Sequence, residues 1–416
     1  MWLTGWDKRI KITIDHTKID SQLSHFPITL FLEAENGETN KVFDEVGDNK
    51  LKIAITQTDG ETELCAEIEK WDSENKTGVI HLSKTGWDIP NDVDYNIYLY
   101  YDLTHADNDN IGDDPDDTAS NAVWDTNYKM VQHMKNDTTS TIKDSTSNSN
   151  NGTKKGIGEP TEVNGKIGKA QDFDGVDDFV EVDALMNDIA ESLIGTVSFW
   201  VKIASDNEDE RDIFDITRDA IGADTELRIV CDMRVDHKWL AVGLEVDDKS
   251  LFKVYPPLDS MSSYIGEWLF ITIVHDGIEL KIYYNGISQK LTWQDSGETE
   301  DKTKWFKAIL TDAINPSDTA NIGILKRDGA DLIPFEGFLD ELRISNTDRS
   351  SSYIKASYNS GNDSLLSYGN EVEFADGGMI PADPKNHNGY LCFMQQYIKN
   401  KVADKDPLKL PDGTIW

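Results

Sequence analysis

The residues with the clearest chemical potential in this sequence are four aspartates that lie close together in one turn. Asp172, Asp174, Asp177 and Asp178 fall within seven residues around Gly175. Carboxylates at this density repel one another, so either a bound cation or exposure to solvent must relieve the repulsion. Ca²⁺ prefers oxygen ligands from carboxylates and backbone carbonyls. The turn therefore predicts either a structural Ca²⁺ site on Asp174, Asp177 and Asp178 or a solvated acidic turn.

Sequence motifs for catalysis are absent. The chain contains no G-x-S-x-G nucleophile turn, no Gly-rich phosphate loop and no H-E-x-x-H pair, and its eight histidines are scattered. A glycoside hydrolase needs two carboxylates across a cleft. The chain has 77 acidic residues, so some two carboxylates will always satisfy this requirement. Composition alone therefore cannot identify the chain as a glycoside hydrolase. We predict no catalytic residues and no enzymatic activity, with a glycanase as the less favoured alternative.

Tryptophans offer a second kind of chemistry, since an aromatic ring can stack on the apolar face of a sugar. Trp200 and Trp268 lie inside apolar runs and are predicted to be core residues. Trp239, Trp293 and Trp305 lie close to predicted loops. We take Trp239 and Trp293 as the candidates for glycan contact.

Short strands must position these side chains. The runs 170–173 and 179–182 flank the acidic turn. Asp-Gly between apolar residues is typical of a β-hairpin, because Gly accepts a positive φ. In the first 125 residues, short runs of alternating polar and apolar residues are separated by Gly, Asn, Asp and Pro. Such runs predict a β-sandwich.

Charge and cysteine content narrow the class of protein. The net charge of −37 and the pI near 4.4 argue against nucleic-acid binding, since affinity for phosphate comes mainly from Lys and Arg. Three cysteines make no disulfide framework, which favours folding in a reducing cytosol. The first residues show no basic region before an apolar run, so we expect no signal peptide. No stretch approaches the ~20 apolar residues of a membrane span.

Four segments resemble the laminin-G-like (concanavalin A-like) family, in the family's order. They are 165–182 (GKIGKAQDFDGVDDFVEV), 196–202 (TVSFWVK), 267–286 (EWLFITIVHDGIELKIYYNG) and 335–345 (FEGFLDELRIS). The resemblance implies a jelly-roll sandwich whose closing strand runs close to the opening hairpin. Asp340 lies in that closing strand, so the resemblance adds Asp340 to the predicted Ca²⁺ ligands.

The first 125 residues resemble another family, the domain of unknown function 2341. The matching residues are Gly5-Trp6-Asp7 with Arg9, then Phe26-Pro27-Ile28, the run 67–71 (EIEKW) and the run 96–102 (NIYLYYD). Asp102 stands where the family has Gly. Members of this family often precede laminin-G-like domains, which is the order here, and the family implies no catalytic residues.

A C-terminal tail lies outside both resemblances. Its one amphipathic helix is predicted at 390–402, with Leu391, Met394, Ile398 and Val402 on one face. An apolar helix face on a tail is suited to docking. We expect the tail to contact another chain or the first domain; packing on the second domain is the alternative.

Together these features predict an all-β chain of two jelly-roll or β-sandwich domains in series, the second concanavalin A-like. The predicted boundaries are 1–125, 126–360 and a C-terminal extension at 361–416 that contains one short helix. The linker between the sandwiches is short, so we expect the two domains to touch.

The function favoured by these features is a non-catalytic virion structural or adhesion protein, such as a phage head fibre, decoration or tail-associated protein, made in the host cytoplasm. It would carry a carbohydrate-binding-type module for host-surface glycan. Its expected partners, through the tail, are other virion proteins or a second copy of itself. The alternative is a secreted or surface carbohydrate-binding protein of a prokaryote.

Overall fold

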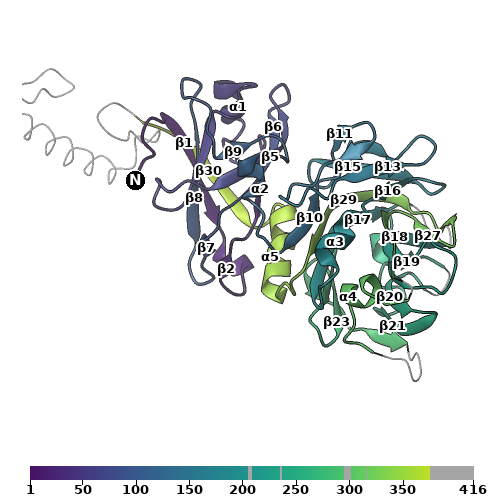
Figure 1. The fold of residues 1–416 in the computed structure, drawn as a ribbon. Helices are drawn as coiled ribbons and strands as arrows, with labels where there is room; N and C mark the ends of the chain where they lie inside the picture. The colour runs from purple at the N-terminus through teal and green to yellow at the C-terminus, as the bar shows by residue number, and fades with distance from the viewer. Residues whose placement is uncertain (205–208, 235–236, 295–300, 315, 375–416) are drawn as a thin grey trace, which may run out of the picture.

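The chain folds into two β-sandwich domains that lie side by side (Figure 1). The computed structural model describes residues 1–204, 209–234, 237–294, 301–314 and 316–374. Strands predominate in both domains and the helices are short, so the predicted all-β fold is confirmed. In the ranges described, no helix is both long enough and apolar enough to cross a membrane.

Two four-stranded sheets form the first domain, in the orders β30-β1-β8-β4 and β3-β6-β5-β9. Their strands are β1 (Lys8–Ile14), β3 (Ile28–Leu32), β4 (Ile53–Thr56), β5 (Cys65–Asp72), β6 (Thr77–Ser83), β8 (Tyr95–Tyr101), β9 (Ile111–Gly112) and β30 (Leu366–Glu373). The smaller elements are β2 (Leu23–Ser24), β7 (Asp88–Ile89), η1 (His16–Lys18), α1 (Lys41–Val46) and α2 (Thr118–Asn121).

Strands β1 and β8 contribute to the first core because their polar and apolar residues alternate. Ile10, Ile12 and Ile14 of β1 are fully buried between the two sheets. Ile97 and Leu99 of β8 join them there. Successive side chains of a strand point to opposite faces, so the period-two pattern of the sequence selects the buried face.

After completing the second domain the chain returns to the first, which corrects the predicted boundaries at 360 and 361. Helix α5 (Ser351–Gly361) begins at the cap Ser350, and it places Tyr353 and Ala356 in the first-domain core. Strand β30 then pairs antiparallel with β1. Because an unpaired edge of β1 would expose its backbone groups, β30 completes the sheet. The predicted helix at 390–402 lies outside the described residues.

Two larger sheets form the second domain. The eight-stranded sheet has the order β14-β15-β29-β17-β22-β23-β24, with β10 also paired to β29. Its strands are β10 (Tyr128–Gln132), β14 (Thr161–Asn164), β15 (Lys169–Asp174), β17 (Gly195–Ile203), β22 (Leu269–His275), β23 (Leu280–Tyr284), β24 (Ile287–Ser288) and β29 (Glu336–Ser345).

The ten-stranded sheet has the order β11-β12-β13-β16-β26-β18-β19-β20-β21-β25. Its strands are β11 (Asn136–Thr138), β12 (Thr141–Ile142), β13 (Gly152–Lys155), β16 (Phe179–Glu181), β18 (Glu210–Thr217), β19 (Glu226–Asp232), β20 (Trp239–Val246), β21 (Lys249–Tyr255), β25 (Thr292–Gln294) and β26 (Thr319–Ile322). The hairpin of β27 (Leu325–Arg327) and β28 (Ala330–Leu332), with α3 (Leu185–Ile189), η2 (Ser262–Tyr264) and α4 (Phe306–Leu310), completes the domain.

The acidic turn joins these two sheets, which corrects the predicted hairpin. Strand β15 pairs with β14 and β29, whereas β16 pairs with β13 and β26 of the other sheet. Phe173 and Val180 both reach the core between the sheets. Because the chain passes from one sheet to the other at this turn, Phe173 enters the core from the eight-stranded sheet and Val180 enters it from the ten-stranded sheet. Gly175 has a φ of +75°, as the predicted turn requires.

The two domains touch through a buried interface, as the short linker predicts. Helix α5 lies between them (Figure 1), and its Ile354 packs on Val274 and Tyr283 of the second domain. On β5, Glu67 accepts hydrogen bonds from Ser145 Oγ at 2.6 Å and from Trp124 Nε1 at 2.8 Å. Polar and apolar contacts therefore both hold the domains together.

Candidate functional site

Side chains of the ten-stranded sheet alternate between the core and an outer face. Leu227, Ile229 and Cys231 of β19 are fully buried in the core. Arg228 and Val230, which alternate with them, therefore point to the outer face. The same alternation places Trp239, Ala241, Gly243 and Glu245 of β20, and Lys253 and Tyr255 of β21, on this face.

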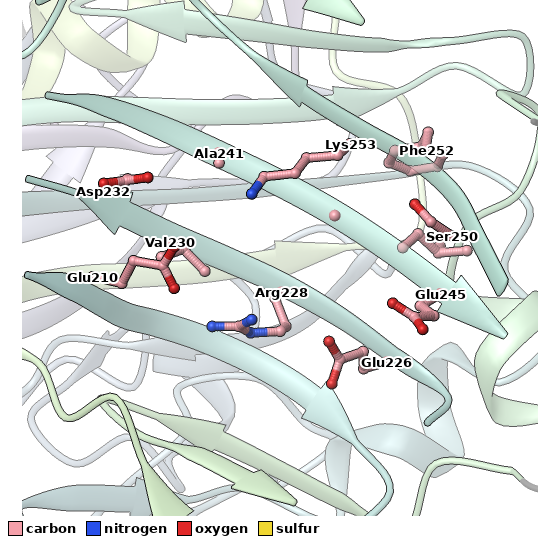
Figure 2. A pocket seen from close by; sticks show the side chains of 12 residues that line it. Glu210, Glu226, Arg228, Val230, Asp232, Ala241, Glu245, Ser250, Phe252 and Lys253 are labelled. Atoms are coloured by element: carbon pink, nitrogen blue, oxygen red, sulfur yellow. The ribbon is translucent and has the colours of Figure 1, made fainter. Parts of the chain in front are cut away.

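A hollow of about 160 Å³ lies on this outer face, over β19, β20 and β21 (Figure 2). Its floor contains the small residues Ala241 and Gly243 of β20. A Cβ added at Gly243 would meet one backbone atom, Phe252 O, at 4.0 Å, so the space above this glycine is open. The polar residues of the lining are Glu210, Glu226, Arg228, Asp232, Glu245, Ser250 and Lys253. The volume is below the ~300–1,000 Å³ of an enclosed ligand site, so binding here would be shallow.

Arg228 is the cation on the β19 side of the hollow. Its Nε donates to Asp212 Oδ2 at 2.8 Å. Its Nη2 is buried and has no hydrogen-bond partner among the residues that the structure describes. Asp212 Oδ1 is also buried and has no hydrogen-bond partner among the described residues. An oxygen of a ligand hydroxyl or carboxylate group is the kind of acceptor that Arg228 Nη2 lacks.

The charge of the hollow depends on Glu226, which lies on the same strand. Burial raises the pKa of Glu226 to about 7, although Arg228 and Arg327 act in the opposite direction. Lys253 reaches over the floor from β21 (Figure 2). Close to neutral pH the hollow can therefore present carboxylate acceptors together with guanidinium and ammonium donors.

Of the two tryptophans predicted to contact glycan, Trp239 shares the outer face with the hollow. It is two residues before Ala241 on β20, and its ring stacks between Tyr255 and His237, with ring centroids 4.0 and 4.7 Å away. Its exposed fraction is 8%. Trp239 Nε1 has no hydrogen-bond partner within the described ranges.

The second candidate, Trp293, lies on the other face of the sheet. It pairs with Val254, a core residue, and its half-buried ring packs against the same core. The ring meets Phe252 edge-on, and Lys302 Nζ lies 4.5 Å from its centroid. The structure therefore does not bring Trp293 together with Trp239. A contact of either ring with glycan stays a prediction.

The acidic turn gathers three of the four predicted Ca²⁺ ligands. Asp174, Asp177 and Asp178 each place one carboxylate oxygen within 4.8 Å of the others. Val176 N donates to Asp174 Oδ1 at 2.8 Å, and Asp174 N donates to Asp178 Oδ2 at 3.1 Å. Burial and the neighbouring carboxylates raise the pKa of Asp178 to about 6. Binding of Ca²⁺ by these three residues stays a prediction.

Asp340 does not join them, so its prediction as a Ca²⁺ ligand is wrong. The register of β15 on β29 sets Asp174 opposite Glu336. Asp340 is four residues further along β29, about 13 Å away along the strand. It is fully buried and accepts a hydrogen bond from Ile167 N at 2.8 Å. The closing strand does run beside the opening strand, but the turn lies next to Glu336 at the start of β29, whereas Asp340 lies at the middle of that strand.

Sequence reasoning missed the residues of the hollow, Arg228, Gly243 and Lys253. A signal was present in 226–232 (ELRIVCD), where Glu, Arg and Asp alternate with apolar residues. This alternation predicts a polar outer face on the strand. The order of the strands in the sheet determines which neighbours complete the hollow. A local pattern of alternation does not predict that order.

No family model matches this chain, and no curated protein matches it. Among solved structures, the chain is similar to the CBM40 of Ruminococcus gnavus IT-sialidase, with 13% identity over 45% of this chain and 96% of that one, and a TM-score of 0.37. It is similar to the receptor binding domain of botulinum neurotoxin C/D mosaic serotype, with 17% identity over 56% of this chain and 51% of that one, and a TM-score of 0.40.

A leech intramolecular trans-sialidase is similar at 16% identity, over 48% of this chain and 27% of that one, with a TM-score of 0.37. At these identities and scores the likenesses carry no information on the site.

Proposed function

We propose that this chain is a non-catalytic glycan-binding protein whose ligand lies in the hollow on the outer face of the ten-stranded sheet. The observation that carries the proposal is the hollow itself, a floor of Ala241 and Gly243 surrounded by charged side chains of neighbouring strands. Sugar hydroxyls both donate and accept hydrogen bonds, so they suit mixed walls of carboxylates, guanidinium and ammonium groups.

Arg228 adds an energetic reason for a ligand. A buried donor without a partner costs about 1–3 kcal/mol, and a ligand that pairs with it recovers this cost. The planar guanidinium is already oriented by its bond to Asp212. The Arg228 side chain is partly exposed, and a small rotation of its guanidinium would present Nη2, which is buried as it lies, to a hydroxyl or carboxylate group.

A glycan array tests this proposal on the full chain. We expect retention of at least one glycan, and loss of that retention in Gly243→Leu, because a leucine fills the hollow without a backbone conflict. Thr292→Leu is the matched control, an exposed position on β25 outside the lining, and it should bind like wild type. Failure of the array to retain the protein, or equal retention of Gly243→Leu, overturns the proposal.

The biological setting that we propose is a phage particle, with the chain as a structural or adhesion protein of the head or tail. The acidic all-β chain with two free, unbridged cysteines in its described part supports this setting. So does the tail, which begins as a strand added to the first domain. Proteomics of purified virions is the test: presence of the protein in the particles is expected, and its absence from them contradicts this setting.

A prokaryotic surface protein with the same glycan site is the alternative setting. Fractionation separates the two, since a surface protein is found on cells that carry no phage. A glycanase is the alternative activity, because carboxylates line the hollow. Release of new reducing ends from a polysaccharide retained by the protein would replace the non-catalytic proposal with that activity.

A further inference from the structure

Four buried side chains that could bind a metal meet at the interface between the two domains. Glu69 of β5 and His81 of β6 come from the first domain. His133, directly after β10, and Glu341 of β29 come from the second. All four are at most 5% exposed, and one ligand atom of each lies within 4.8 Å of the others. This cluster is distinct from the hollow and from the acidic turn.

The ligand atoms lie close to the spacing that a small cation requires, and the ion would replace two direct contacts between them. His81 Nε2 lies 2.8 Å from Glu69 Oε2 and 3.9 Å from Glu341 Oε1. His133 Nδ1 lies 3.9 Å from Glu69 Oε2 and contacts Glu341 Oε1. Tetrahedral Zn²⁺ with bonds of about 2.0–2.1 Å needs ligand atoms roughly 3.3 Å apart, which is within this spread. Two imidazole nitrogens and two carboxylate oxygens are ligands that Zn²⁺ accepts.

The other nitrogen of His81 has an outer hydrogen-bond partner, and the other nitrogen of His133 faces a carboxylate without a hydrogen bond. His81 Nδ1 lies 3.1 Å from Thr29 Oγ1. His133 Nε2 lies 3.4 Å from Glu67 Oε2. In metal sites a partner of this kind fixes the ring and directs the opposite nitrogen at the ion.

The two glutamates are held in the same way. Arg343 Nε donates to Glu341 Oε2 at 3.0 Å, and Lys169 N donates to Glu69 Oε1 at 3.3 Å. In each carboxylate the oxygen that faces the cluster is therefore the one left for the ion. Glu69, His81 and Glu341 are therefore each held by a hydrogen bond from outside the cluster, whereas His133 Nε2 only faces the Glu67 carboxylate.

Backbone strain directs one ligand into the cluster. Glu341 has a φ of +55°, which a residue with a side chain rarely adopts. It lies where the register between β17 and β29 shifts. Glu69 lies at a similar register shift between β5 and β6. Proteins retain backbone strain and β-bulges of this kind at positions where a side chain must point in a particular direction.

Electrostatics also favour a cation. Glu67, Glu69, Asp340 and Glu341 are all buried at this place, and Arg343 supplies one permanent positive charge through its bond to Glu341. The two imidazole rings are nearly parallel, with centroids 4.5 Å apart, so both histidines approach the same place from the two domains. A divalent ion at this place would offset the charge of the carboxylates that Arg343 does not pair.

A path connects the cluster to solvent. A cavity of about 120 Å³ is lined by Glu67, Glu69 and His133. Asp113 and Asp114, which are half-buried, line the same cavity. Lys135 and Lys143 line it as well, and Lys143 pairs with Asp114, so the walls carry both charges and the cavity serves as a route to the buried ligands.

We propose that Glu69, His81, His133 and Glu341 bind one divalent transition-metal ion, with Zn²⁺ as the best match, and that this ion joins the two domains. Two ligands from each domain would make the interface depend on the metal. Because the metal binds only the assembled form, it stabilises the folded chain by mass action.

The test uses the full chain, freed of metal by chelation and held in excess Ca²⁺ to occupy exposed carboxylates. Zn²⁺ titration is expected to give one tight site per chain and a higher melting temperature. His81→Gln and His133→Gln should each weaken Zn²⁺ binding more than about a hundredfold. His275→Gln, which replaces a buried histidine of β22 outside the cluster, should bind like wild type.

A second measurement does not depend on whether the variants fold. Co²⁺ added to the intact chain should give the visible spectrum of a tetrahedral site with imidazole ligands. Absence of stoichiometric Zn²⁺ uptake by the intact chain overturns the proposal and leaves the cluster as an ion-paired network. So does an all-oxygen octahedral Co²⁺ spectrum, or unchanged Zn²⁺ binding in both folded histidine variants.

Discussion

Glu226 changes its charge close to neutral pH, since burial raises its pKa to about 7 and Asp212 and Asp224 oppose its ionisation further. Because its pKa is raised on folding, its contribution to stability is present below its unfolded pKa of about 4.5 and is lost as the pH rises through about 7. The Glu226→Gln variant cannot ionise at this position. Its free energy of unfolding relative to that of wild type should therefore increase by on the order of 2 kcal/mol from about pH 5 to about pH 8.

Urea unfolding of both proteins at the two pH values measures this gain. A difference between wild type and Glu226→Gln that is the same at both pH values would show that the carboxyl ionises without cost, contrary to its buried position beside the other carboxylates.

The acidic turn carries a second prediction at the residue scale. If Asp174, Asp177 and Asp178 bind Ca²⁺, millimolar Ca²⁺ should raise the melting temperature, because the ion relieves the repulsion of three close carboxylates. Asp177→Asn should reduce this shift. Identical melting curves of wild type with Ca²⁺ and with excess chelator would rule the site out and leave a solvated turn.

Among the elements, β30 is the one whose loss should matter most to the first domain. Tyr368 Oη accepts a hydrogen bond from Phe31 N at 3.0 Å, and Glu371 accepts one from Tyr101 Oη at 2.5 Å. Leu366 packs against the first core. Deleting 366–416 should therefore lower the free energy of unfolding by about 3 kcal/mol or more.

Deleting 375–416 is the matched control, because it leaves every described element in place. It should lose less stability than the 366–416 deletion in the same denaturant titration. Equal stability of the two truncated chains would show that β30 adds nothing to the sheet.

Elements with a strong local pattern could be predicted from the sequence, and their long-range pairing could not. The alternation in 9–14 predicts β1, and the apolar run in 267–286 contains β22. The partner of β1 across the sheet edge is more than 350 residues away, and nothing in either segment specifies it. The acidic turn shows the same limit, because a hairpin and a crossover between sheets share the same Asp-Gly signal.

Sites formed by several segments were beyond sequence reasoning for the same reason. Arg228, Ala241 and Lys253 lie on three strands whose order in the sheet sets their spacing. Glu69 and Glu341 meet only because the domains touch. Single residues such as Trp239 could be singled out by type, but the face on which Trp293 lies depends on its pairing with Val254.

At the scale of the whole molecule, the shared helix α5 should make the two domains unfold together. Tyr353 and Ala356 belong to the first core, while Ile354 packs on the second domain. Scanning calorimetry of the full chain is expected to show one cooperative transition. Two resolved transitions would indicate that the interface contributes little to either domain.

The central claim, a glycan site on the outer face of the ten-stranded sheet, is tested most directly by a crystal structure of the chain with the glycan that it retains best. The account predicts a sugar ring over Ala241 and Gly243, with the Arg228 guanidinium donating to a hydroxyl or carboxylate oxygen of the sugar and a carboxylate of the lining accepting from a hydroxyl group. Glycan bound elsewhere on the molecule, with the hollow filled by solvent, would contradict it.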